Sequence, residues 1–298
     1  MTPLLQVEHL NRHFPRRGGA PLRAVDDVSF HIDEGEVFGL VGESGCGKST
    51  TGRCILRLIE PTSGTVRFKG EDVTAFSPAR LRLARRDMQV VFQDPYSSLN
   101  PRMRVDAIVR EPLEIHGVGT AAAREARVDE LFSLVGLDPE HRRRFPHEFS
   151  GGQRQRIGIA RALALEPALV ILDEAVSALD VSIQAQIVAL LRELRSRLKL
   201  TYLFISHDLR LVADFCDRVA VMHRGQIVEL ATAADVFTRP QHPYTEALLA
   251  SIPSLDPDVR LPPPLRVEDD APQSPLREVA LGHWARTADT NRAGSHAT

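Results

Sequence analysis

Nine consecutive residues have the side chains and the spacing of a phosphate-binding loop. They are Gly42, Glu43, Ser44, Gly45, Cys46, Gly47, Lys48, Ser49 and Thr50, which fit the pattern G-x-x-x-x-G-K-[ST] at every position. The glycines let successive backbone N–H groups point at phosphate oxygens, because no Cβ blocks the approach. The lysine can reach the β- and γ-phosphate oxygens, and the Ser49 hydroxyl can ligate Mg²⁺. The loop therefore predicts a nucleotide site that uses Mg²⁺.

The segments on either side of this loop support that prediction. Residues 37–41 have the apolar composition of a short buried strand, and residues 48–58 have the apolar spacing of a helix. Phosphate would then lie at a helix N-terminus, where unpaired amides and the helix dipole favour negative charge. An ordinary glycine-rich turn is the alternative, and it gives no reason for this strand and helix.

Three further segments are predicted to be buried strands that end in polar residues. Strand 88–92 is followed by Gln93, strand 168–172 by Asp173 and Glu174, and strand 201–205 by His207. Open α/β sheets bind ligands at the carboxyl ends of their strands, so these side chains are expected near the phosphates. We expect Asp173 and Gln93 to serve Mg²⁺, and Glu174 to orient and deprotonate the attacking water. A solvated acidic pair at a strand end is the alternative for Asp173 and Glu174.

A second candidate anion site lies at Ser150, Gly151, Gly152 and Gln153, just before a predicted helix at 154–165. Ser150 has the chemistry of an N-cap. A capped helix start after a flexible glycine pair can bind an anion for the same reason as the first site, because unpaired amides and the helix dipole favour negative charge there. An ordinary capped helix is the alternative.

Phe14 is placed to stack on an adenine ring, and a core phenylalanine is the equal alternative there.

Composition limits the classes of protein to which the chain can belong. It has 298 residues, 43% of them hydrophobic, and a formal net charge of −2 with both signs interspersed, so a nucleic-acid partner is not indicated. No apolar run approaches 18 residues and the N-terminus has no secretory pattern, so we expect a cytoplasmic location. Three scattered cysteines argue against a zinc site or disulfide scaffold.

The domain prediction has two parts. Residues 1–252 form one nucleotide-binding domain, into which a helical subdomain is inserted at about 101–165. Residues 253–298 contain seven prolines and few apolar runs, which predicts a disordered or loosely docked tail.

The ordered set of these motifs resembles the ATP-binding subunit of an ABC transporter over roughly residues 4–252. The set is 42–50, Gln93, 150–153, Asp173 with Glu174, 177–180 and His207. Longer strings resemble the oligopeptide and dipeptide importers within that family: 92–95, 98–102, 146–149, 181–186 and 241–245, the last being Gln-His-Pro-Tyr-Thr. The resemblance implies an α/β P-loop core with a mixed sheet, an antiparallel β subdomain and an inserted helical subdomain.

The resemblance also implies partners and further roles. Two ATP-binding subunits, identical or paralogous, would face each other, with each ATP between one chain's phosphate loop and the other chain's Ser150–Gln153. Phe14 would stack on adenine, Gln93 would link the γ-phosphate to the permease, Asp180 would contact the opposite subunit, and His207 would bind the γ-phosphate. Two integral-membrane permease subunits and, indirectly, an extracytoplasmic substrate-binding protein complete the implied assembly, at the cytoplasmic face of the membrane.

Two departures from the family pattern stand out. The family usually has proline after the glutamate, whereas this chain has Ala175, which removes a restriction on Glu174. Family members commonly have a cysteine-rich C-terminal segment, and residues 253–298 contain no cysteine, so we expect no iron–sulfur cluster.

Three other classes of ATPase share parts of this pattern. DNA-repair ATPases with the same head carry very long insertions between loop and signature, but here the interval runs only from Ser49 to Ser150. Translation-factor relatives carry two cassettes in one chain, and this chain has one. An ATPase of another transport system, for nickel, glutathione or export, remains the alternative to peptide import.

Overall fold

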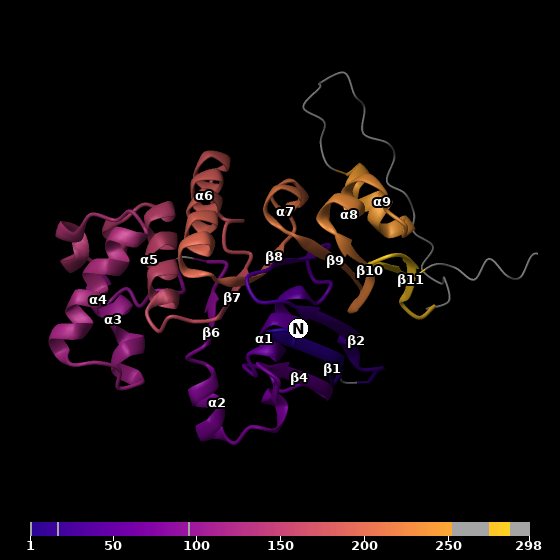
Figure 1. Cartoon of the computed structure of the whole chain (residues 1–298), viewed down its shortest axis with the longest axis horizontal. Coiled ribbons are helices and arrows are strands. Elements are labelled where there is room, and N and C mark those ends of the chain that lie inside the picture. The colour runs from indigo at the N-terminus through magenta and orange to yellow at the C-terminus, as the bar shows by residue number, and fades with distance from the viewer. Residues whose placement is uncertain (1, 17, 95, 252–273, 287–298) are drawn as a thin grey trace, which may run out of the picture.

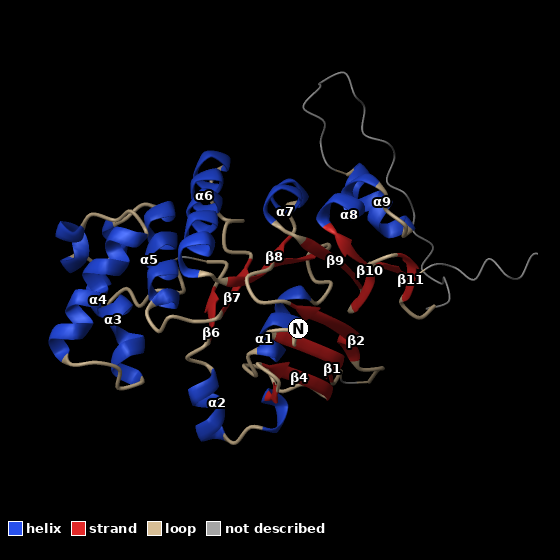
Figure 2. Cartoon of the chain, viewed as in Figure 1, coloured by secondary structure: helices blue, strands red, loops and turns tan. Residues whose placement is uncertain are grey.

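The structure is a computed structural model, and it describes residues 2–16, 18–94, 96–251 and 274–286. Two sheets organise these residues (Figures 1 and 2). The larger sheet has eight strands in the order β11-β12-β10-β9-β3-β8-β7-β6, and the smaller has four in the order β2-β1-β4-β5. This mixed sheet with flanking helices and a separate antiparallel sheet is the fold class that the sequence predicted.

The strands of the large sheet are parallel from β9 to β6, whereas β10 and β12 continue it antiparallel. Every residue of β3, β7 and β8 is buried, as expected for parallel strands covered on both faces. The bounds are β3 (Val37–Val41), β6 (Met88–Val91), β7 (Leu169–Asp173), β8 (Thr201–Ser206), β9 (Arg218–His223), β10 (Gln226–Thr232), β11 (Arg277–Ala280) and β12 (His283–Ala285).

The small sheet is antiparallel throughout and packs beside the phosphate-loop helix α1 (Lys48–Ile55). Its strands are β1 (Leu5–Phe14), β2 (Leu22–Ile32), β4 (Ser63–Phe68) and β5 (Glu71–Asp72). A short helix, α2 (Pro78–Ala84), and a 3₁₀ turn, η1 (Val73–Ala75), lead from this sheet back to β6.

The helical subdomain lies at one end of the molecule, away from the C-terminal strands (Figure 1). It contains α3 (Val105–Ile115), α4 (Ala121–Leu134) and α5 (Gly151–Leu163), with the 3₁₀ turns η2 (Pro139–Arg143) and η3 (Pro146–Glu148). The remaining helices are α6 (Val181–Leu198), α7 (Leu209–Phe215), α8 (Ala233–Thr238) and α9 (Pro243–Ala250). Among the described residues, no helix is both long and apolar enough to cross a bilayer.

The side chains of β3 alternate between two hydrophobic cores. Val37 and Val41 pack into the core that continues into the helical subdomain, whereas Phe38 and Leu40 pack into the core shared with the small sheet. Successive side chains of a strand point to opposite faces, so β3 is held from both sides. The phosphate loop that follows it therefore starts from a fixed point.

The prediction for the C-terminal tail was wrong in its middle part. Strand β12 pairs with β10 through Glu229 and Leu230, and β11 pairs with β12, so residues 277–285 form a hairpin that extends the main sheet. His283 and Ala285 are buried against it. Proline content did not reveal this hairpin, because all seven prolines of the predicted tail precede it. Residues 253–273 and 287–298 of the predicted tail lie outside the described residues.

Candidate nucleotide site

The phosphate loop joins β3 to α1, and two of its glycines are required by close backbone approaches. Gly42 has φ +144° and Gly47 has φ +114°. A Cβ at Gly42 would lie 2.1 Å from the Met222 carbonyl oxygen, and one at Gly47 would lie 2.0 Å from that of Ala24. Any larger residue at either position would displace the backbone of β2 or β9.

Lys48 is buried inside the loop that it closes. Its Nζ donates to the carbonyl oxygens of Gly42 at 2.8 Å and Glu43 at 2.9 Å, and the residue is only 3% exposed. The atoms nearest this buried ammonium are these two neutral carbonyl oxygens and, at 3.9 Å, Cys46 Sγ. A phosphate bound at the loop would give the ammonium an anionic partner at close range.

Ser49 and Asp173 form the part of the site that fits Mg²⁺. The Ser49 hydroxyl donates to Asp173 Oδ1 at 2.6 Å, and Arg53 lies 3.9 Å from Asp173 Oδ2. Burial raises the pKa of the Asp173 carboxyl, while the Ser49 hydrogen bond and Arg53 lower it. A hydroxyl beside a buried carboxylate at a phosphate loop is the hard-oxygen donor set that Mg²⁺ prefers.

Glu174 lies next along the chain and is contacted from two other strand ends. Its Oε2 accepts from Gln93 Nε2 at 3.0 Å and lies 3.3 Å from His207 Nδ1. Its side chain is only 11% exposed, and its backbone has φ +50°. The neighbouring strands β6, β7 and β8 therefore end at the same edge of the sheet and bring these three polar side chains together. The sequence predicted polar residues at these strand ends, but it did not predict that the strands are neighbours.

The backbone of Glu174 is fixed by its neighbours. Its N–H donates to the Ile205 carbonyl at 2.9 Å, and its carbonyl accepts from the Ser177 hydroxyl at 2.9 Å. Ala175 follows in a buried position. A left-handed glutamate is strained, so these hydrogen bonds hold the conformation without the usual proline.

The second candidate anion site is the start of α5, and its glycines belong to the helix itself, not to a flexible link before it. Ser150 is the N-cap, with its hydroxyl accepting from Gln153 N, while Gln153 Oε1 accepts from Ser150 N. This capping box extends the helix three residues earlier than predicted. Ser150 and Gln153 are exposed and the two glycines between them are half-buried, so the start of α5 lies at the surface.

The side chains that lie against the start of α5 belong to the segment that follows Glu174 in the chain. A Cβ at Gly152 would lie 2.6 Å from Ile183, whereas one at Gly151 would have only an ordinary 3.4 Å contact with Leu179. Asp180 is the N-cap residue of α6, but its exposed side chain makes no capping hydrogen bond. Its carboxylate therefore lies at the surface, at the start of α6.

Phe14 ends β1 opposite Leu22 and is half-buried, outside the hydrophobic cores. The guanidinium of Arg12 lies 4.4 Å from the centre of its ring. The core alternative for Phe14 is therefore not favoured.

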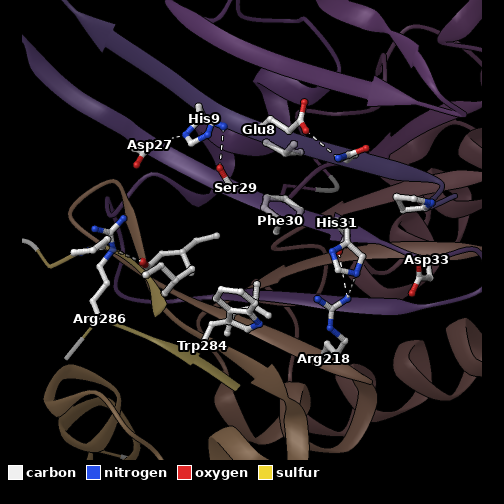
Figure 3. A pocket seen from close by; sticks show the side chains of 17 residues that line it. Glu8, His9, Asp27, Ser29, Phe30, His31, Asp33, Arg218, Trp284 and Arg286 are labelled. Carbon is white, nitrogen blue, oxygen red and sulfur yellow. Dashed lines mark hydrogen bonds and ion pairs between the residues drawn. The ribbon is translucent and has the colours of Figure 1, made fainter. Parts of the chain in front are cut away.

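Two cavities lie beside these elements. One of about 600 Å³ is lined by Arg53, Gln93 and Asp173 together with Glu111 and Arg161 of the helical subdomain, so it connects the site to that subdomain. The other, of about 820 Å³, lies between β1, β2 and the C-terminal hairpin (Figure 3). Figure 3 shows Trp284 of the hairpin facing the side of the cavity that carries Phe30 and His31. Its lining includes no residue of the phosphate loop.

One residue near the loop was missed as a site residue. The Tyr244 hydroxyl accepts from the Glu43 N–H at 3.1 Å. The sequence signal for Tyr244 is its place in the string 241–245, which supports the family resemblance but does not indicate a contact with the phosphate loop.

A glycine loop joins a parallel strand to a helix, its lysine is buried, and its serine is hydrogen-bonded to the aspartate that ends another parallel strand of the same sheet. These features define a P-loop nucleoside triphosphatase. More closely, residues 25–177 match the family model described as ABC transporter, and residues 228–274 match the oligopeptide/dipeptide transporter C-terminal region. The chain belongs to the ABC transporter family, as one of its ATPase subunits.

Similar proteins agree with this assignment. A putative peptide import ATP-binding protein of Brucella ovis is 57% identical over 259 residues, covering 87% of this chain and 81% of that protein. The oligopeptide transport ATP-binding protein OppF of Bacillus subtilis is 52% identical over 290 residues, covering 94% and 95%. A solved dimeric ATP-binding cassette, bound to ADP and Pi after hydrolysis, superposes with a TM-score of 0.70 at 28% identity, covering 77% of this chain and 98% of that one.

Proposed function

We propose that this ATPase energises the import of peptides through a membrane permease. The observation that carries the proposal is the match of residues 228–274 to the oligopeptide/dipeptide transporter C-terminal region. The names of the Brucella and Bacillus relatives point the same way.

Within one subunit, each residue has a distinct task. The loop amides and Lys48 bind the phosphates, and Phe14 stacks on the adenine. Ser49, Asp173 and Gln93 hold Mg²⁺, which when bound neutralises charge on the phosphate oxygens. Glu174 orients and deprotonates the attacking water, and His207 contacts the γ-phosphate. The 3.0 Å bond from Gln93 and the 3.3 Å approach of His207 support this assignment, since they fix the Glu174 carboxylate.

Two ATP-binding subunits, identical or paralogous, work as a pair. The exposed start of α5 at Ser150–Gln153 covers the nucleotide held by the opposite phosphate loop, and Asp180 contacts that subunit. A helix N-terminus that lies at the surface can accept a phosphate from outside the chain, and the start of α5 lies there. ATP then favours the closed pair over the separated subunits, because in the closed pair it contacts both of them. Hydrolysis removes the preference of the nucleotide for the closed pair.

The helical subdomain contacts the permease at the cytoplasmic face of the membrane. The cavity that joins Gln93 and Asp173 to Glu111 and Arg161 supports this arrangement, because it connects the site to that subdomain. Two permease subunits span the bilayer, and an extracytoplasmic binding protein delivers the substrate.

The alternative is another substrate or direction: nickel, glutathione or export. The test is ATP-driven uptake of a labelled tripeptide into vesicles that contain the chain, its permeases and its companion ATPase. We expect uptake that Glu174→Gln abolishes. The labelled tripeptide has ordinary α-peptide bonds, whereas glutathione has a γ-glutamyl linkage. Transport of nickel or glutathione in place of this α-linked tripeptide would refute the peptide assignment without affecting the ATPase assignment.

A further inference from the structure

One peptide unit of the phosphate loop is held at both of its ends. The carbonyl of Gly42 accepts from Lys48 Nζ at 2.8 Å, and the N–H of Glu43, in the same planar unit, donates to the Tyr244 hydroxyl at 3.1 Å. Gly42, at φ +144°, has the freedom to let this unit rotate. The two external hydrogen bonds therefore decide its orientation.

Tyr244 is itself fixed on several sides. It is 3% exposed, and its ring lies against His223 with 4.0 Å between ring centres. Its backbone N–H donates to Nδ1 of His242, the N-cap residue of α9. Burial raises the pKa of Tyr244 to about 12, so the hydroxyl stays protonated at neutral pH. This side chain can hold the loop with little movement.

A buried carboxylate fixes the turn that carries Tyr244. Glu229 of β10 is fully buried, and its two oxygens accept from the backbone N–H groups of Gln241 at 2.8 Å and His242 at 3.0 Å. A third donor comes from the C-terminal hairpin, where His283 Nε2 lies 2.8 Å from Glu229 Oε1. A carboxylate buried this deeply is tolerated only with such partners, so the turn and the hairpin depend on one another.

We propose that Tyr244 is a positioning residue for the phosphate loop, and that Glu229 couples it to the C-terminal hairpin through His283. The chain of contacts runs from β12 to Glu229, to the turn at 241–242, to Tyr244 and then to the Gly42–Glu43 peptide. The hairpin thereby becomes part of what shapes the nucleotide site, although it lies more than 200 residues along the chain from the loop.

The test compares two tyrosine-to-phenylalanine variants in the full chain. Tyr244→Phe should weaken binding of a non-hydrolysable ATP analogue with Mg²⁺ about three- to tenfold, the usual effect of one hydrogen bond. KM for ATP should rise similarly with little change in kcat, since loop shape affects ground and transition states alike. Tyr202→Phe is the matched control, because Tyr202 is buried and its hydroxyl donates to Leu191 away from the site.

A merely structural role would give a different pattern. Both variants would then lower the melting temperature, and both would bind the analogue with the wild-type Kd. That result would overturn the positioning role of Tyr244.

The coupling to the hairpin is tested with a double-mutant cycle. His283→Ala should weaken binding of the same analogue about two- to threefold, while Glu278→Ala, whose carboxylate accepts from Gly282 within the hairpin, should not. In the double variant Tyr244→Phe/His283→Ala, the loss should be smaller than the product of the two single losses, since both act on one hydrogen bond. Multiplying effects would refute the coupling through Glu229.

Discussion

The Ser49 hydroxyl donates a 2.6 Å hydrogen bond to Asp173 Oδ1, which joins the first turn of α1 to the end of β7. These two oxygens belong to different motifs that are 124 residues apart. Each motif alone indicates a function, but their contact establishes one site. It also places a carboxylate that is only 5% exposed beside the phosphate loop.

Asp173→Asn should stabilise the protein without metal but remove its response to Mg²⁺. Burial raises the carboxyl pKa, so the folded chain keeps this proton to a higher pH than the unfolded chain. Between the pKa of Asp173 in the unfolded chain and its higher pKa in the folded chain, the folded state binds more protons, so stability falls as pH rises. Above both pKa values the full cost of burying the ionised carboxylate is present. Asparagine removes that cost and still accepts from Ser49.

Scanning calorimetry at pH 7 checks this prediction. Without metal, the variant should melt at a higher temperature than the wild type, because it no longer carries a buried carboxylate. Adding Mg-ATP should raise the wild-type melting temperature far more than that of the variant. A variant that melts lower without metal would contradict the cost assigned to Asp173.

Lys48→Ala should remove nucleotide binding. Its ammonium is buried with two carbonyl partners and would make charge-assisted contacts to phosphate, so affinity should fall about 100-fold or more. Titration calorimetry with Mg-ATP measures this loss. Lys69→Ala is the matched control, because Lys69 pairs with Asp87 on the surface and should leave the Kd unchanged. Equal affinities in the two variants would exclude this loop as the site.

Sequence patterns predicted the parts of the site that are local. The glycines, Lys48 and the strand-end residues lie within short segments whose apolar spacing fixes strand and helix, so their positions followed from periodicity. The contact of Tyr244 with Glu43 joins residues 201 positions apart and depends on the packing of α9. No local pattern encodes such a contact. His283 was missed for a similar reason, since its burial requires Glu229.

Glu174→Gln should leave ATP binding intact and trap the closed pair of subunits. Glutamine keeps the size of the side chain and one acceptor for Gln93, but it cannot take a proton from water. Turnover should fall about 10²- to 10⁴-fold, as for loss of a general base. Phosphate release measures turnover, and size-exclusion chromatography with ATP measures the pair. Glu166→Gln, at an exposed ion pair with Arg127, is the control. Unchanged turnover in Glu174→Gln would place the base elsewhere.

Gly151→Ala should block the pairing of subunits without harming the single chain. A Cβ at this position meets only Leu179, at 3.4 Å, so the fold and the phosphate loop should be unaffected. It would, however, project from the exposed start of α5, where the phosphate of the opposite subunit is expected. The melting temperature and the Kd for Mg-ATP should therefore match the wild type, while ATPase activity falls about tenfold or more, the loss of one or two charge-assisted hydrogen bonds.

Gly152→Ala separates this effect from damage to the helix. Its Cβ would lie 2.6 Å from Ile183, so α5 must shift and the melting temperature should fall together with activity. Gly151→Ala should lose activity alone. In the proposed pair, ATP hydrolysis at each nucleotide site depends on the start of α5 supplied by the other subunit. Full ATPase activity in Gly151→Ala would therefore show that this helix start takes no part in hydrolysis.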